Sequence, residues 1–229
     1  MKLAIMQPYY FPYIGYFQLI QAVDVFVVYD DVNYINRGWI NRNYVLSNEQ
    51  KIRLTLQLEG ASQNRLINEI QIGCNNDKLL KTIQLGYAKA PYFEMAFPVI
   101  KEALLNVETN LAKYLTNGLE NICHYLDINT QWYLSSAIEK NNALRGQEKI
   151  LAICKYFNAT QYINMPGGKL LYDHKKFAEH NIQLSFITPE IVPYQQTKGE
   201  FVPYLSIIDV MMYNSQQKCQ QMVREFELV

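Results

Sequence analysis

Residues 2–29 read KLAIMQPYYFPYIGYFQLIQAVDVFVVY, and this stretch decides the fold. Residues 3–6 and 25–29 are continuous apolar runs, which are typical of strands buried on both faces of a parallel sheet. Between them, residues 16–22 predict a short helix. A strand, a helix and a second strand in this order predict a βαβ unit with parallel strands.

The link between the first strand and the helix is rich in aromatic residues. Residues 6–16, MQPYYFPYIGY, contain four tyrosines and one phenylalanine, whereas a plain turn is usually built from Asn, Asp, Ser and Gly. Open α/β sheets bind ligands at the carboxyl ends of their strands. We therefore expect a rigid pocket wall here, and the candidate substrate-binding residues are Gln7, Tyr9, Tyr10, Tyr13 and Tyr16.

Other segments complete the expected fold. Residues 51–58 predict a half-buried strand, because apolar and polar residues alternate from residue 52 to residue 58. This strand should form a β-hairpin with residues 39–46 around a turn at 47–50. Apolar residues spaced three and four apart predict packing helices at 77–89, 95–105 and 109–126. A second α/β segment follows, with a helix, strand, loop, helix and strand expected at 147–157, 161–164, 165–168, 169–180 and 182–186.

These patterns predict the fold class and the domain organisation. We expect one α/β domain over residues 1–229, with a mainly parallel Rossmann-like sheet, a β-hairpin and a helical insertion at about 77–130. The apolar segment 205–213 suits either the core or an interface between copies of the chain, so a homo-oligomer stays an open alternative.

Composition narrows the classes of function. The chain has 21 Lys and Arg residues and 21 Asp and Glu residues, and a net charge of +0 argues against nucleic acid as a partner. The four cysteines are widely separated and form no CxxC pair, so we expect reduced thiols, no structural zinc and a cytoplasmic location. No stretch approaches the roughly 18 apolar residues of a spanning helix, so we expect no membrane insertion.

Polar side chains follow the second predicted strand. Asp30, Asp31 and Asn33 should emerge at the same sheet edge as the aromatic stretch, so both would face one crevice. A desolvated carboxylate there can act as a general base toward a sugar amine or hydroxyl, which makes Asp30 and Asp31 candidate catalytic residues. The alternative is that one carboxylate caps a turn and the other is solvated.

Residues 37–43, RGWINRN, combine groups that suit a nucleotide-linked sugar. Arg37 and Arg42 can hold phosphate, Asn41 and Asn43 can bind hydroxyls, and Trp39 can stack on a sugar ring. Strand alternation places Trp39, Asn41 and Asn43 on one face and Arg42 on the other. We favour the first three together with Arg37, and a surface salt bridge is the alternative for Arg42.

Two later segments add candidate binding residues. Gly167 and Gly168 precede a predicted helix and can offer free amides to a phosphate, although a plain turn is the alternative. Tyr172 lies in that helix. Gln196 belongs to a long loop, residues 188–203, that can close over the same crevice.

Several blocks of the sequence resemble the WbqC-like protein family. The blocks are residues 6–20 (MQPYYFPYIGYFQLI), 22–34, 37–46 (RGWINRNYVL), 87–93, 135–136, 162–168 with Tyr172, and 192–214 (VPYQQTKGEFVPYLSIIDVMMYN). Members are associated with surface-polysaccharide and O-antigen assembly, and some are suspected of attaching an acyl or aminoacyl group to an amino sugar. The resemblance therefore implies a transferase that acts on an amino sugar, and it implies no particular cofactor. Together with the cysteines and with residues 37–43, it leads us to expect a cytoplasmic enzyme whose amino sugar is nucleotide-linked. Members often have His where Met6 stands, so this chain lacks any base at that position.

Two other classes of function stay open. The strand, Pro-rich loop and helix also look like the opening of nucleotidylyltransferases and related ligases that use ATP, but Tyr13 and Tyr16 stand where their HxGH motif has histidines. Tyrosine does not supply the imidazolium charge of that motif. The third reading is a non-catalytic module that binds a nucleotide sugar or a partner enzyme.

Overall fold

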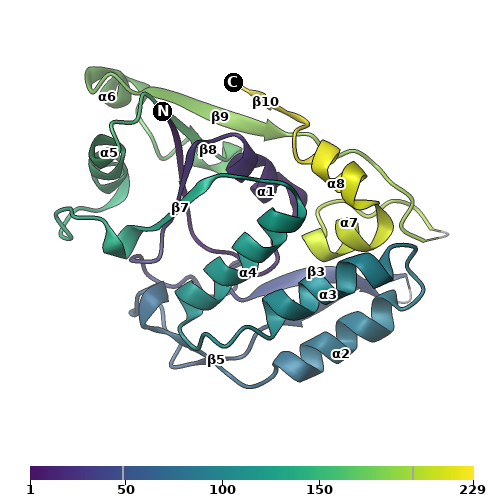
Figure 1. Ribbon diagram of the computed structural model, residues 1–229. Coiled ribbons are helices and arrows are strands. Elements are labelled where there is room, and N and C mark those ends of the chain that lie inside the picture. Colours follow the sequence, from purple (N-terminus) through teal and green to yellow (C-terminus); the bar gives the residue numbers. More distant parts are fainter. Residues whose placement is uncertain (48, 198) are drawn as a thin grey trace.

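A computed structural model describes residues 1–47, 49–197 and 199–229, so Asn48 in the expected turn lies outside the described residues. Figure 1 shows the arrangement of the elements. The strands are β1 (Lys2–Met6), β2 (Val25–Val28), β3 (Arg42–Ser47), β4 (Gln50–Thr55), β5 (Leu58–Glu59), β6 (Gln71–Ile72), β7 (Gln131–Leu134), β8 (Gln161–Asn164), β9 (Gln183–Pro189) and β10 (Phe226–Leu228). The α-helices are α1 (Ile14–Gln21), α2 (Asn76–Tyr87), α3 (Phe93–Leu104), α4 (Leu111–Tyr125), α5 (Gly146–Tyr156), α6 (His174–Glu179), α7 (Ile207–Tyr213) and α8 (Gln216–Met222).

The central sheet has six strands in the order β10-β9-β8-β1-β2-β7. Read from the other edge and counted along the chain, this is the 3-2-1-4-5-6 order of the Rossmann fold. The strands β7, β2, β1, β8 and β9 are parallel, and β10 pairs with β9 in the antiparallel direction. The predicted βαβ unit and the mainly parallel Rossmann-like sheet are confirmed.

Both faces of the sheet are covered, which explains why its central strands are apolar throughout. Leu3 and Val27 belong to the buried cluster that contains residues of α5 and α6. Ala4 and Phe26, their neighbours in sequence, belong to the cluster that contains residues of α1 and α4. Because successive side chains of a strand point to opposite faces, each strand contributes to both layers.

The predicted hairpin is also confirmed. Strands β3 and β4 pair in the antiparallel direction, from Arg42 opposite Thr55 to Ser47 opposite Gln50, and form a sheet separate from the central one. Figure 1 shows this hairpin together with α2 and α3 on the side of the molecule away from α5 and α6. The helices α2, α3 and α4 fill the stretch expected as a helical insertion, and the single-domain organisation stays a prediction.

The helix expected at 169–180 is shorter than predicted. The structure has a 3₁₀ turn at Pro166–Gly168, and α6 begins only at His174. Asp173 caps this helix, because its side chain accepts a hydrogen bond from the backbone N–H of Lys175. In the described ranges, no helix is long and apolar enough to cross a membrane.

One buried side chain joins α1 to the C-terminal segment. Gln18 is fully buried, and its amide nitrogen lies 2.8–2.9 Å from the carbonyl oxygens of Glu190, Met222 and Glu225. Glu190 follows β9, Met222 ends α8 and Glu225 precedes β10. Backbone N–H groups also donate to the carbonyls of Met222 and Glu225, whereas that of Glu190 has no second donor among the described residues. Gln18 therefore ties the antiparallel edge of the sheet to the first helix.

We predict that Gln18→Leu lowers the free energy of unfolding by about 2 kcal/mol or more, because it leaves the Glu190 carbonyl without its donor and removes the hydrogen bonds to the carbonyls of Met222 and Glu225. Urea unfolding followed by circular dichroism measures the change. Gln21→Leu, at the end of the same helix, serves as the matched control and should change stability by no more than about 0.5 kcal/mol. Equal effects of the two substitutions would contradict this role of Gln18.

Candidate functional site

Backbone hydrogen bonds fix the aromatic loop, which we define as residues 7–13 between β1 and α1. The backbone N–H of Tyr10 donates to the carbonyl oxygen of Trp39 (3.1 Å). The Asn43 amide donates to the carbonyl oxygen of Phe11 (2.7 Å), and Phe11 itself has a φ of 42°, which is unusual for a residue other than glycine. The hairpin therefore holds the loop in a strained backbone conformation.

The start of α7 holds the other side of the loop. The Ser206 hydroxyl donates to the carbonyl oxygen of Phe11 (2.8 Å), and the backbone N–H of Ile207 donates to that of Pro12 (2.8 Å). Ser206 is also the N-cap of α7, so one residue both begins the helix and positions the loop.

A cavity of about 370 Å³ lies between the aromatic loop, the hairpin and the segment before α7. This volume is within the usual range of small-molecule sites. Tyrosine and tryptophan rings form most of its wall, and the Tyr13 and Tyr204 rings meet edge to face with centroids 6.0 Å apart. The lining residues are Tyr9, Pro12, Tyr13, Trp39, Asn43, Lys51 and Tyr204.

The cavity brings together four predicted binding residues and two that sequence reasoning missed. Tyr9, Tyr13, Trp39 and Asn43 were predicted, and Lys51 and Tyr204 were not. Lys51 is the only charged residue among the described lining residues, and its ammonium group lies 4.6 Å from the centre of the Tyr44 ring. Lys51 lay within a predicted strand, and no local motif distinguished it.

The tyrosine hydroxyls of the cavity are hydrogen-bond donors rather than bases. Burial, with smaller contributions from Tyr204 and Tyr9, raises the pKa of Tyr13 to about 12. Burial also raises the pKa of Tyr9. Both hydroxyls therefore stay protonated at neutral pH and can bind the oxygen atoms of a ligand.

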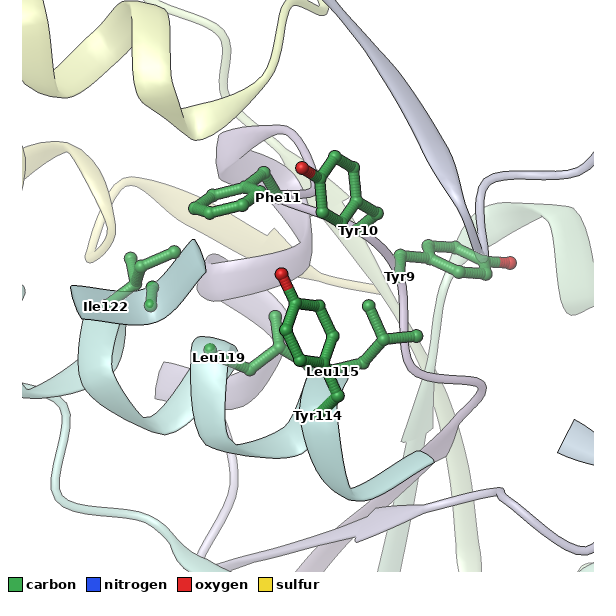
Figure 2. Close-up of a pocket in the computed structure, with 9 residues that line it drawn as sticks. Tyr9, Tyr10, Phe11, Tyr114, Leu115, Leu119 and Ile122 are labelled. Carbon is green, nitrogen blue, oxygen red and sulfur yellow. The ribbon is translucent and has the colours of Figure 1, made fainter. Parts of the chain in front are cut away.

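Behind the aromatic loop lies a second, much smaller pocket. Figure 2 shows Tyr10 and Phe11 on one side of it and the α4 side chains Tyr114, Leu115, Leu119 and Ile122 on the other. Its free space is about 10 Å³, enough for about one water molecule. Tyr10 is 1% exposed and belongs to the core, as does Tyr16, whose hydroxyl donates to the carbonyl oxygen of Gln7. These two predicted residues support the loop from below.

Asp30 is held by hydrogen bonds at the end of β2. Its side chain accepts from the backbone N–H (2.9 Å) and the hydroxyl (2.6 Å) of Ser136, and from the Asn68 amide (3.3 Å). The residue is 1% exposed. Its contacts join β2 to the segment after β7.

Asp31 forms a buried ion-pair cluster with two lysines. Its Oδ2 atom lies 2.9 Å from Lys140 Nζ and 3.0 Å from Lys149 Nζ, and the two lysine side chains are only 1% and 3% exposed. Lys149 also donates to the backbone carbonyl of Asp31 and lies over the Tyr29 ring, and Lys140 donates to the carbonyls of Ser135 and Ile138. Each ammonium group is thus fully engaged.

The cluster shifts the pKa values of its members. Burial by itself would raise the pKa of Asp31, but hydrogen bonds, those from Lys140 and Lys149 among them, outweigh it and hold the pKa below its usual value. Burial lowers the pKa of Lys149, and Asp31 opposes that change. Neither carboxylate lines the aromatic cavity, so the expected single crevice holding both the aromatic and the acidic residues is not what the structure has.

The structure places the arginines and amides of the hairpin region apart from one another. Arg37 is exposed and has a φ of 62°. Asn41 is buried, where it accepts from the Tyr34 hydroxyl and donates to the carbonyl of Leu56. Arg42 is half-buried. None of these three predicted residues belongs to the cavity lining found in the described part of the chain.

The remaining predicted residues lie around the carboxyl edge of the sheet. Gln7 and Gly167 follow β1 and β8, the neighbouring strands at which the strand order reverses. Gly168 is packed so tightly that a Cβ would lie 2.5 Å from the Asn164 amide.

The last three predicted residues make contacts within the protein. Tyr172 packs against Tyr162, with ring centroids 5.7 Å apart. Asn33 is exposed and donates to the carbonyl of Gln63, and Gln196 is buried beside Asp209.

A mostly parallel sheet in Rossmann order, with an aromatic cavity after its first strand, defines an α/β protein with a candidate site for a ligand. The chain belongs to the WbqC-like protein family, whose model matches residues 7–221, so the resemblance noted from the sequence is confirmed. It is 30% identical over 215 residues to an uncharacterized protein of Mycobacterium tuberculosis, and the match covers 92% of each chain. No solved structure matches the chain.

We predict that Asp31→Asn lowers the free energy of unfolding by roughly 3–5 kcal/mol, because it leaves two buried lysines without their counter-charge. Chemical denaturation measures this loss. The control is Asp127→Asn, which removes the exposed ion pair with Arg224 (3.1 Å) and should cost only about 0–1 kcal/mol. If Asp31→Asn lowered the free energy of unfolding as little as the control does, the stabilising role of the ion-pair cluster would be contradicted.

The same cluster predicts a pH dependence. The pKa of Asp31 in the folded protein lies below its unfolded value of about 3.9, so the ion pairs stabilise the fold above that pH. Their contribution is lost as the pH falls through the folded pKa. The difference in stability between the wild type and Asp31→Asn, measured by denaturation from neutral to acidic pH, should therefore shrink below about pH 4. A difference that stays constant would contradict the lowered pKa.

Proposed function

We propose that this protein is a cytoplasmic transferase of surface-polysaccharide (O-antigen) biosynthesis, which moves an acyl or aminoacyl group onto the amine of a nucleotide-linked amino sugar. The observation that carries the proposal is the aromatic cavity. Its rings come from the aromatic loop (Tyr9, Tyr13), from the segment before the hairpin (Trp39) and from the segment before α7 (Tyr204). Aromatic faces suit the apolar C–H face of a sugar ring, and tyrosine hydroxyls suit its oxygen atoms.

Lys51 supports an anionic ligand rather than a neutral one. It is the one charged lining residue of the cavity in the described ranges, and its charge is positive. An ammonium group forms charge-assisted hydrogen bonds with phosphate oxygens. A sugar attached to a nucleotide through phosphate supplies both an uncharged ring and such a group.

The proposed reaction forms an amide bond. The neutral amine attacks the carbonyl carbon of the donor, a C–N bond forms, and the bond from that carbon to the leaving group breaks. The nitrogen loses one proton, which passes to the leaving group or to water. The described cavity lining contains no carboxylate and no imidazole, so we infer that the protein acts mainly by holding the two substrates in a reactive orientation. Asp30 and Asp31 stay hypothetical bases, although their present partners favour structural roles.

A non-catalytic module is the second candidate, and it is favoured by the described cavity lining, which contains no carboxylate and no imidazole. Mass spectrometry of UDP-glucosamine distinguishes the transferase from the non-catalytic module. The sugar nucleotide is incubated with the protein and either acetyl-CoA or an amino acid with ATP and Mg²⁺. A gain of one acyl or aminoacyl mass supports the transferase, binding without product supports the module, and hydrolysis of ATP alone would favour the ligase-like class.

Trp39 can report directly on occupancy of the cavity, because the chain has only two tryptophans. The other, Trp132, packs against Phe26 with centroids 4.9 Å apart. In a Trp132→Phe variant, UDP-glucosamine should change the emission of Trp39 in a saturable manner. The matched Trp39→Phe variant should show no response. A saturable response of Trp132 alone would place the ligand elsewhere.

We predict that Lys51→Met weakens binding of UDP-glucosamine by about ten- to a hundredfold, since a hydrogen bond to a charged group contributes about 1.5–3 kcal/mol. Binding of uncharged N-acetylglucosamine should stay unchanged. Titration of Trp39 emission provides the dissociation constants of both ligands. Lys155→Met, on the exposed part of α5, is the control for net charge. Equal losses for both ligands would contradict a phosphate contact of Lys51.

A further inference from the structure

Asp209 is a buried carboxylate with neutral partners. It lies in the first turn of α7 and is 0% exposed. Its Oδ2 atom accepts from the Tyr87 hydroxyl (2.8 Å), and its Oδ1 atom accepts from the Tyr194 hydroxyl (2.8 Å) and the Gln196 amide (2.7 Å). No Lys, Arg or His pairs with it among the described residues. Burial raises the pKa of Asp209, and these hydrogen bonds oppose the rise.

Gln196 connects this carboxylate to the C-terminal loop, which we define as residues 190–206 without residue 198. Its side-chain oxygen accepts from the backbone N–H of Val202 (2.8 Å), and its amide nitrogen donates to the carbonyl of Val202 (3.0 Å). The side chain therefore pairs with Val202 as a neighbouring strand would. The loop is closed into a turn whose base is fixed on Asp209.

Tyr204 follows this turn and faces the aromatic cavity. It has a φ of 58°, and its ring packs edge to face against Tyr13. Tyr204 stands between the Gln196–Val202 contacts on one side and, on the other, Leu205, which is buried, and Ser206, which is bonded to the aromatic loop. A non-glycine residue in such a backbone conformation persists only where its surroundings determine it.

The network reaches the hairpin as well. The Tyr87 hydroxyl, which donates to Asp209, also accepts from the backbone N–H of Leu46 in β3 (3.0 Å). Asp209 therefore joins α2, the hairpin, α7 and the C-terminal loop. The hairpin and the loop both contribute walls of the cavity, through Lys51 and Tyr204.

We propose that Asp209 is the positioning residue of the aromatic cavity: its carboxylate clamps the C-terminal loop and so holds Tyr204 as one wall of the ligand site. It acts through Tyr194 and Gln196 and touches no ligand. A cavity formed before the ligand arrives loses less entropy on binding, so the clamp raises affinity. The affinity part of this proposal rests on the proposed function, whereas the clamp itself does not.

Hydrogen exchange followed by mass spectrometry tests the clamp without a ligand. Asp209→Asn keeps the size of the side chain but replaces one acceptor oxygen with a donor. Exchange in peptides from the C-terminal loop should become at least about tenfold faster, while peptides from β8 and α5 should keep the wild-type rate. Gln196→Leu should have the same local effect. A uniform increase over the whole chain, or no change in the loop, would overturn the clamp.

Binding then tests whether the clamp shapes the cavity. In the Trp132→Phe background, Asp209→Asn should weaken the binding of UDP-glucosamine about tenfold, measured at a temperature where the protein stays folded. Thr116→Val, which removes a buried hydrogen bond within α4, is the control for lost stability and should leave affinity unchanged. An unchanged affinity in Asp209→Asn would overturn the positioning role.

If the proposed function is wrong, the role of Asp209 can still be tested without a ligand. If the wild-type protein binds no sugar nucleotide, acrylamide quenching of Trp39 replaces the affinity measurement. Release of Tyr204 should then raise the quenching constant of Trp39 in Asp209→Asn and leave it unchanged in Thr116→Val. Identical quenching in both variants and the wild type would overturn the role of Asp209 in the cavity wall.

Discussion

Hydrogen bonds to the carbonyl groups of the aromatic loop are the constraint on which the rest of the site depends. A loop that leaves the middle of a sheet buries backbone acceptors, and unpaired acceptors there would cost free energy. Asn43 supplies a donor from the hairpin, and Ser206 and Ile207 supply donors from the start of α7. The hairpin and the C-terminal helices are therefore bound to the sheet, and the tyrosine rings remain free to line the cavity.

Local sequence patterns predicted the parts of the fold that local physics controls. The apolar runs of β1 and β2 and the alternation in β4 identified these strands, because burial on two faces or on one imposes a distinct period. The edge strands β7 and β10 were not predicted. They are four and three residues long and none of their residues is fully buried, so their sequences are too short to show a clear period. Residues 169–173 were wrongly predicted as helix, since the cap at Asp173 decided the true start.

The candidate site was predictable only where its residues are neighbours in sequence. Tyr9 and Tyr13 belong to one motif, and Trp39 and Asn43 to another. Lys51 and Tyr204 reach the cavity through strand pairing and the clamped loop, which no single segment encodes. The lysine that engages Asp31 most fully, Lys149, is 118 residues away in sequence. Asp31, which the sequence suggested as a base, is therefore a member of an ion-pair cluster, and its lysine partners stabilise its charged form.

The buried acids explain why the cavity itself has a positive charge. Asp30 accepts from neutral donors, Asp31 is paired through Oδ2 with two lysines, and Asp209 accepts from tyrosine and glutamine side chains, so each carboxylate is directed toward the protein. Lys51 is then the charge that a ligand meets. Lys51 is exposed, so under the proposed function its ammonium group is accessible to a ligand and favours one that bears phosphate over a neutral one of the same shape. Under the proposed function, the rings recognise the sugar and the lysine recognises its nucleotide.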